Sequence, residues 1–446
     1  MKHFSEARRE AKEAVCQNKS LLEGVSCVCL IWDIKGILRA LLKIDKKGDI
    51  KKAKTIVSGI LQNAAGPFWK HEIWVWSDKW SSPAERAVYR EAWKHALTIE
   101  TGPPEIKILD RRISKSSWFN PVLGEPWPLN EHTPPILSFY SFKGGVGRTT
   151  ALASLAIQLA RSGKKVAAID LDLEAPGLSS LLPGAEGRVA EYGVIDYLLE
   201  RCILGSRKDL DIADYYHLVD DPRVVSGGPP ITVVPAGKLD HDYLEKLSRV
   251  DYESLVRPLE PGKSSPAPLN ELLEQLKSQR QIDYFLLDSR AGFHDLGGLA
   301  LSGISHLDII FGLDSEQSWR GMELVVRFLG QDRIWADQRQ LLCAFVFALA
   351  PSAGSAFRDE AFPRFLDKAY DLFVDCFYYP QGSAPEDGWD VPAIEDSTQP
   401  HYPIALDFDA RMQQARRIEE IADTLCQNEF KGFGELVLER VGRALS

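Results

Sequence analysis

The stretch from Ile136 to Ala160 has the sequence ILSFYSFKGGVGRTTALASLAIQLA, and it decides the fold of the larger part of the chain. An apolar run, Ile136 to Phe142, leads into a glycine-rich loop, and a helical pattern follows from Thr150 to Ser162. Backbone N–H groups of such a loop can point at phosphate oxygens, and the start of the helix adds the positive end of its dipole. The sequence therefore predicts a phosphate-binding loop between a strand and a helix.

Two further segments follow the pattern of a strand that ends in aspartate. Residues 168–177 (AIDLDLEAPG) place Asp170 and Asp172 two positions apart, so both side chains would point to the same side of an extended chain. Residues 283–292 (DYFLLDSRAG) end an apolar strand in Asp288. These carboxylates could face the phosphates. Alternatively, Asp170 and Asp172 only end a strand and cap a helix.

Apolar runs that alternate with helical patterns continue toward the C-terminus. The strand candidates after the phosphate loop are Val166–Leu171, Ile231–Val234, Tyr284–Leu287, Asp308–Leu313 and Leu341–Leu349. Alternation of this kind is typical of a mostly parallel sheet with helices on its faces. The predicted fold class is therefore α/β.

The run KGGVGRTT, from Lys143 to Thr150, resembles the deviant Walker A motif of the ParA/MinD-like ATPases, and it is most similar to a KGGVGR-type branch of them. The run DSRAG at 288–292 resembles the DSRTG run of the same branch. The resemblance extends over residues 136–446 and implies a mostly parallel-sheet, SIMIBI-like P-loop NTPase domain that binds ATP and Mg²⁺. Phe142 and Arg148 depart from the family pattern, which often has glycine and lysine there.

The resemblance also implies roles for individual residues. Lys143, Arg148 and Asp172 are expected to be catalytic, and Thr149, Asp172 and Asp288 to hold Mg²⁺. Lys143 would reach into the nucleotide site of a second copy, so a homodimer on ATP binding and slow, regulated hydrolysis are expected. Arg290 is either a charge-stabilising switch contact or a structural ion pair. The residues expected to bind the nucleotide are Lys143, Gly144, Gly145, Val146, Gly147, Arg148, Thr149, Thr150, Asp170 and Arg290.

One feature of the relatives is missing. MinD-like proteins often use an asparagine after a late strand to read adenine, whereas Leu349 to Ser352 (LAPS) contains none. ATP is therefore favoured over other nucleotides by the resemblance alone.

The part of the chain before the phosphate loop has a different character. Five prolines between Asn120 and Pro135 predict a linker, because proline can continue neither a helix nor a central strand. Residues 1–130 contain 22 basic and 15 acidic side chains, a net charge of +7. Because the whole chain has a net charge of −10, the remaining residues carry −17. Eight of the 11 tryptophans also lie in residues 1–130. We therefore expect a smaller, basic, Trp-rich α/β domain at 1–119, a linker at 120–135 and an ATPase domain at 136–446.

Three apolar runs of the first domain end in aspartate, at Asp33, Asp78 and Asp110. If these runs are neighbouring parallel strands, the carboxylates would gather at one sheet edge and could hold Mg²⁺ as in many nucleases. The alternative is that each aspartate caps a following helix, as Asp33 would cap Ile34 to Leu42. The six lysines between Lys43 and Lys54 allow nucleic-acid binding beside the tryptophans, or only a solvated face of a protein-binding module.

Composition excludes several classes of protein. The seven cysteines are scattered without metal-ligand spacing, which indicates neither a disulfide framework nor zinc and suits the cytoplasm. No apolar run is long enough to span a membrane, so a membrane partner is not expected. The C-terminal pattern Phe433 to Leu445 predicts a helix that docks on the ATPase core rather than on lipid.

The leading functional hypothesis is a nucleotide-dependent dimerisation switch that hydrolyses ATP slowly and controls an N-terminal sensor or effector module. A partner protein is also expected. A role in bacterial defence is one version of this hypothesis. The alternatives are a metal-dependent nuclease regulated by the ATPase, a nucleotide-gated scaffold that does not hydrolyse, and a DNA-partitioning ATPase.

Overall fold

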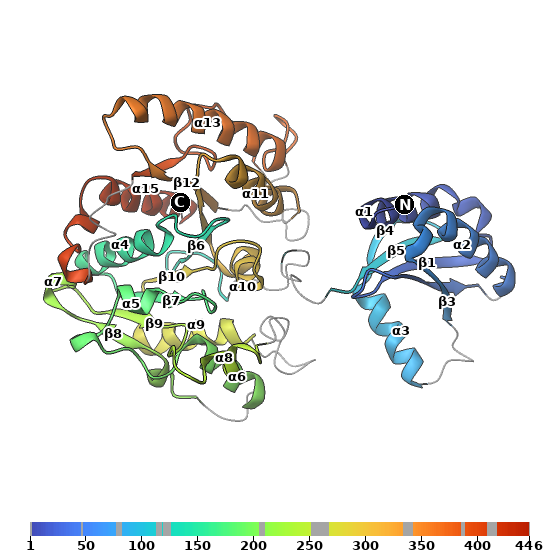
Figure 1. Cartoon of the computed structure of the whole chain (residues 1–446), viewed down its shortest axis with the longest axis horizontal. Helices are drawn as coiled ribbons and strands as arrows, with labels where there is room; N and C mark the ends of the chain where they lie inside the picture. Colours follow the sequence, from blue (N-terminus) through green and yellow to red (C-terminus); the bar gives the residue numbers. More distant parts are fainter. Residues whose placement is uncertain are drawn as a thin grey trace. The chain divides into compact units, whose positions relative to one another are not determined.

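The computed structural model describes residues 2–45, 48–76, 83–112, 118, 126–204, 210–250, 267–332, 342–384, 389–407 and 417–445. The chain divides into two compact units, Met1–Ile113 and Ser114–Ser446. The first unit thus ends a few residues before the boundary expected at 119. Each unit consists of helices packed on a β-sheet (Figure 1). Among the residues described, no helix is long and apolar enough to cross a membrane.

The first unit contains a five-stranded sheet with the order β3-β2-β1-β5-β4. Side chains of β1 alternate between its two faces: Leu30 packs with α1 and α2, whereas Ile31 packs with the cluster that includes Ala92 of α3. The elements are α1 (Phe4–Gln17), β1 (Val25–Trp32), β2 (Leu38–Ile44), α2 (Ile50–Ala65), β3 (Trp69–Trp76), α3 (Pro83–His95), β4 (Leu97–Glu100) and β5 (Glu105–Asp110).

The helix expected from Ile34 to Leu42 is wrong. Asp33 instead closes a turn, because its Oδ1 accepts hydrogen bonds from the backbone N–H groups of Lys35 and Ile37, both at 2.9 Å. The chain then returns as β2, which pairs antiparallel with β1. Leu38, Ala40 and Leu42 pack with α1 and α2, whereas Leu41 packs on the other face with Ala92, so the alternation of a strand prevails over the helical pattern.

The hypothesis of three neighbouring parallel strands that end in Asp33, Asp78 and Asp110 is also wrong. β1 and β5 are parallel neighbours, but β2 lies between β1 and β3 and runs antiparallel to β1. β3 is parallel to β2, so its carboxyl end lies at the opposite edge of the sheet from Asp33 and Asp110. Asp78 itself lies outside the described residues.

The two described aspartates at the edge are each paired with arginine. Asp33 pairs with Arg39, and Asp110 pairs with Arg8 and Arg112. Nowhere in the described part of the chain do three or more metal-binding side chains (His, Cys, Asp, Glu) form a cluster that could hold an ion. The geometry therefore provides no support for the nuclease hypothesis.

The lysine run is divided between two elements. Lys43 lies in β2, whereas Lys51, Lys52 and Lys54 are exposed on the first turns of α2. That helix begins at Asp49, whose carboxylate accepts the N–H groups of Lys51 and Lys52. A solvated helix face explains these lysines, and nucleic-acid binding stays a prediction.

The second unit is built on an eight-stranded sheet with the order β13-β12-β11-β6-β10-β7-β9-β8. All neighbouring pairs are parallel except β8 and β9. The predicted mostly parallel sheet is confirmed, and each predicted strand coincides with an observed one within two residues. The strands are β6 (Ile136–Ser141), β7 (Val166–Asp170), β8 (His217–Val219), β9 (Ile231–Val234), β10 (Tyr284–Asp288), β11 (Leu307–Gly312), β12 (Leu342–Ala350) and β13 (Ile404–Asp407).

Helices cover both faces of this sheet (Figure 1). One face packs against α4 (Arg148–Arg161) and α15 (Asn428–Leu445), and the other against α6 (Val194–Leu204), α9 (Pro268–Arg280), α11 (Glu316–Arg327) and α13 (Ala356–Cys376). The shorter helices are α5 (Leu178–Leu181), α7 (Pro222–Val225), α8 (Tyr243–Leu247) and α10 (Asp295–Leu299).

The C-terminal helix α15 docks on the core, as predicted. Phe433, Val437 and Val441 are buried in the same cluster as the inner face of α4. Arg440 is 8% exposed, and its guanidinium donates to the carbonyl oxygens of Cys343 (3.1 Å) and Tyr402 (2.9 Å). The helix is thus fixed by apolar packing and by one buried arginine.

Candidate nucleotide site

The glycine-rich loop lies between β6 and α4, where the sequence placed it. Gly145 (φ +73°) and Gly147 (φ +81°) have backbone conformations that L side chains rarely adopt, and Gly147 caps α4. A Cβ atom built on Gly144, Gly145 or Gly147 would meet no other atom within 4 Å. At these glycines no side chain therefore separates the main chain of the loop from a cavity of about 470 Å³. Phosphate oxygens could approach its N–H groups at the start of α4.

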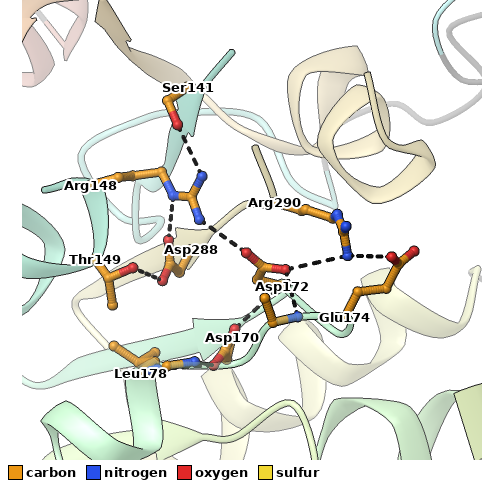
Figure 2. A network of polar contacts seen from close by, with 11 residues as sticks. Ser141, Arg148, Thr149, Asp170, Asp172, Glu174, Leu178, Asp288 and Arg290 are labelled. Carbon is orange, nitrogen blue, oxygen red and sulfur yellow. Dashed lines mark hydrogen bonds and ion pairs between the residues drawn. The ribbon is translucent and has the colours of Figure 1, made fainter. Parts of the chain in front are cut away.

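Arg148 is buried, at 8% exposure, and its guanidinium points into the protein. Nε donates to Oδ1 of Asp288 (2.7 Å), Nη1 to Oγ of Ser141 (3.1 Å) and Nη2 to Oδ2 of Asp172 (3.3 Å), as Figure 2 shows. Arg148 thus connects the strand end of β10 to the segment after β7. It also lines the cavity, so the phosphate role expected for it is compatible with its place and stays a prediction.

Two of the three residues expected to hold Mg²⁺ touch each other, and the third, Asp172, lies across the Arg148 guanidinium from Asp288. Oγ1 of Thr149 donates to Oδ2 of Asp288 at 2.7 Å. Asp172 is linked to Asp288 through Arg148 and lines the cavity together with Thr149. Hydroxyl and carboxylate oxygens are the ligands that Mg²⁺ prefers, so these residues fit the ion.

Asp170 is fully buried and does not line the cavity. Its carboxylate accepts backbone N–H groups from Asp172 (3.0 Å), Gly177 (3.2 Å) and Leu178 (3.1 Å). Burial raises the pKa of Asp170, and the nearby charge of Asp288 adds to the shift. In this structure Asp170 shapes the 172–178 segment, and direct contact with a nucleotide stays a prediction.

Asp172 belongs to a second group of charges that joins the two segments after β7 and β10. Arg290 Nη1 lies 2.6 Å from Oε2 of Glu174 and 3.8 Å from Oδ1 of Asp172, and His294 Nε2 lies 2.7 Å from Oε1 of Glu174. Burial raises the pKa of Asp172, while the charge of Arg148 opposes the shift. Of the two interpretations of Arg290, the ion pair is observed, and it connects the two segments (Figure 2).

Lys143, in contrast, makes no hydrogen bond or ion pair with any of the described residues. Its side chain is half-buried at the beginning of the loop. Phe142, which precedes it, packs against the ring of Phe293 at 5.3 Å. The Phe142 ring also occupies the space beside Gly321 of α11, where a Cβ atom would come within 2.1 Å.

Part of the cavity lining comes from the C-terminal third of the chain, where the sequence pointed only to the stretch that begins at Leu349. These lining residues come from three elements distant in sequence: Leu349 of β12, Leu406 and Asp407 of β13, and Phe430 of α15. No asparagine lines the described cavity. Glu174 and His294 were also missed. The alternation Asp170, Asp172, Glu174 is a signal that could have found Glu174, whereas nothing in the sequence marks His294 or Phe430.

A mostly parallel sheet, a glycine loop without side chains at the start of a helix and a hydrogen-bonded threonine–aspartate pair define a phosphate-loop nucleotide-binding domain. The family model of the CobQ/CobB/MinD/ParA nucleotide binding domain matches residues 137–442, and the chain belongs to this family. ATP and Mg²⁺ are the ligands that ParA/MinD proteins of this family bind.

Curated relatives include the septum site-determining protein MinD of Helicobacter pylori (45% identity over 69 residues, 16% of this chain and 25% of the relative). MinD of Synechocystis sp. is 32% identical over 157 residues, 35% of this chain and 45% of the relative. The chain thus spans between a quarter and just under half of the length of these two proteins. Among solved structures, MinD from Pyrococcus horikoshii complexed with Mg-ADP is similar, with 20% identity, a TM-score of 0.43 and coverage of 69% of this chain and 96% of that one.

Proposed function

We propose that the chain is a nucleotide-dependent dimerisation switch that hydrolyses ATP slowly and controls the unit Met1–Ile113. The observation that carries the proposal is the contrast between Lys143 and its neighbours. Arg148, Asp172, Asp288 and Arg290 all have charged partners within the site, whereas Lys143 has none among the described residues. A half-buried ammonium at the opening of a phosphate site is available to the phosphates of a facing copy.

The paired charges support slow hydrolysis. Arg148 must exchange at least part of its contacts with Asp288 and Asp172 for phosphate oxygens, and phosphoryl transfer depends on such positioning of charge. Asp172 would then be released to orient the attacking water. Mg²⁺ held near Thr149 and Asp288 would neutralise phosphate charge.

The solution mass tests the switch directly. We expect Mg-ATP to double the mass of Asp172→Asn, measured by light scattering, because this variant would bind ATP without hydrolysing it. Adding Lys143→Ala should keep the protein monomeric while ATP still binds. Lys164→Ala is the matched control, since Lys164 is exposed in the turn after α4, at the other end of that helix from the loop.

A mass that ignores ATP although the nucleotide is bound would contradict the proposal. So would a dimer that forms equally well without Lys143. Equilibrium binding of a fluorescent ATP analogue in the same samples separates these outcomes from loss of the nucleotide site.

The ion pairs of Arg148 favour a second candidate, a nucleotide-gated scaffold that does not hydrolyse. Its guanidinium is already satisfied by two carboxylates and one hydroxyl, which stabilises the arrangement without phosphate. Steady phosphate release by the wild type that is lost in Asp172→Asn would exclude the scaffold. Defence and DNA partitioning stay hypotheses about the pathway in which the switch or the scaffold acts.

A further inference from the structure

Trp118 lies on the path between the two units. It follows Ile113, the last residue of the first unit, by five positions and packs inside the second unit. The side chain is 9% exposed, and its indole Nε1 donates to the backbone carbonyl of His294 at 2.8 Å. Its ring lies 5.2 Å from the rings of both Phe293 and Phe328.

The loop that receives this indole also belongs to the nucleotide site. His294 contacts Glu174 through its ring, and Glu174 holds Arg290 beside Asp172. Phe293, one residue before His294, packs against Phe142 of the phosphate loop. Two parts of the site, the phosphate loop and the acidic segment after β7, are therefore in direct contact with residues 290–294, here called the 290–294 loop.

The loop is also attached to β6 beneath the site. The N–H group of Gly292 donates to the carbonyl of Ser141 (3.0 Å), and the hydroxyl of Tyr140 donates to the carbonyl of Gly292 (3.1 Å). Trp118 adds to this attachment through a main-chain acceptor, the carbonyl of His294, and its ring lies 5.9 Å from the ring of Tyr140. Any displacement of the loop backbone must therefore change the surroundings of the indole, because packed interiors transmit small shifts.

We propose that Trp118 is a positioning residue that couples the 290–294 loop to the beginning of the second unit, so that a change of nucleotide state moves this indole, five positions after the last residue of the first unit. The inference rests on the proposed switch and names the residue through which the switch acts on the beginning of the second unit.

Trp127 provides a matched control, nine positions further along the chain and also inside the second unit. It is 5% exposed, and its Nε1 donates to the carbonyl of Pro134 at 2.7 Å. Its described ring contacts are with Phe285, His306 and Lys277, none of which belongs to the 290–294 loop. The two tryptophans thus match in burial and in hydrogen bonding, and they differ in what they touch.

The experiment uses the full chain labelled with 5-fluorotryptophan and observed by ¹⁹F NMR. Trp118→Phe and Trp127→Phe assign the two resonances by their disappearance. We expect the Trp118 resonance to shift when Mg-ATP is added to Asp172→Asn, and the Trp127 resonance to stay in place. Trp118→Phe keeps a ring but removes the N–H donor, so it should change ATP affinity by about two- to tenfold, the factor that one hydrogen bond supplies. Trp127→Phe should leave that affinity unchanged.

The outcomes separate the two proposals. If ATP doubles the mass but the Trp118 resonance does not move, or if both variants change affinity equally, the coupling role is wrong and the switch stands. If neither mass nor any resonance responds to saturating ATP, the proposed function fails and the coupling fails with it.

Discussion

At the scale of single residues, the charge balance of the site depends on Arg148. Its guanidinium faces two carboxylates, and Asp288 is 1% exposed. Bringing such groups out of water is costly, so the pair is weak evidence for net stability. Removing one partner is different, because it leaves a buried charge uncompensated.

Arg148→Ala should therefore lower the free energy of unfolding of the nucleotide-free protein by about 3–5 kcal/mol. Arg148→Lys should cost less, about 1–2 kcal/mol, since an ammonium keeps the charge but lacks the fork that reaches Asp288, Asp172 and Ser141 together. Urea denaturation measures both. Arg188→Ala, which removes an exposed arginine paired with Glu186, should leave the unfolding midpoint in place. Equal midpoints for all three variants would refute this account of the site.

The residues of the site differ in how far the sequence predicts them. Arg148, Thr149, Asp172 and Asp288 lie in short contiguous motifs whose local geometry determines where their side chains point. Trp118 and His294 meet across 176 positions of sequence, and Phe430 and Asp407 reach the cavity only through the packing of α15 and β13. Contacts of that kind follow from tertiary structure, so no local pattern announces them.

At the scale of elements, the phosphate loop is fixed to α11 by one close approach. Gly321 has no side chain where the ring of Phe142 lies, 2.1 Å from an ideal Cβ position. Alanine normally stabilises a helix interior relative to glycine by about 1 kcal/mol. Here the gain is opposed by a clash with a residue of the loop.

Gly321→Ala should thus destabilise the protein by about 1–3 kcal/mol, the usual cost of overpacking. In a Phe142→Ala background the same change should become neutral or stabilising, because the ring is gone. Thermal unfolding of the four proteins in this double-mutant cycle gives the coupling energy. Gly432→Ala in α15 is the control, since a Cβ there meets nothing within 4 Å. Additive effects would show that the ring moves aside without cost.

A group of hydrogen bonds to Asp314 joins α11 and α13 to the end of β11. Asp314 accepts hydrogen bonds from Trp319, Arg364 and Lys368. Burial opposes ionisation, but these donors lower the pKa of Asp314 to about 2. The folded pKa is below the unfolded value of about 3.9, so the contribution to stability is complete above that value and is lost as pH falls from about 4 to about 2.

Asp314→Asn should consequently cost about 1–2 kcal/mol at pH 7, a value reduced because Arg364 and Lys368 are about half exposed. The cost should shrink toward zero near pH 2. Chemical denaturation at several pH values measures it, with Asp371→Asn on the exposed side of α13 as the control. A cost independent of pH would mean that shape, and not charge, is what the carboxylate provides.

The elements themselves were predicted unevenly, and the reason is physical. Buried parallel strands such as β9 and β10 are short apolar runs with clear ends, so their positions were correct within two residues. β2 was mistaken for a helix because Ile34 to Leu42 is apolar at both periodicities, and only pairing with β1 decides between them. β8 and β13 have three and four residues and are only partly buried, so no continuous apolar run marks them, whereas all four residues of β9 are buried.

At the scale of the whole molecule, the two units have separate hydrophobic cores. Two clusters lie on the two faces of the sheet around β1, and three surround the sheet that carries the phosphate loop. Each core is closed by helices of its own unit. Units of this kind are expected to unfold as separate cooperative transitions.

Calorimetry of the full chain should therefore show two transitions, and Mg-ATP should raise only one of them. At a free concentration of about 100 times its dissociation constant, a ligand adds about 2.7 kcal/mol to the unit that binds it. Leu30→Ala in β1 and Leu286→Ala in β10 assign the transitions, because both side chains are fully buried and each truncation should cost about 2–5 kcal/mol in its own unit. We expect ATP to move the transition that Leu286→Ala lowers. If both variants and ATP shift one common transition, the first unit is thermodynamically joined to the nucleotide site.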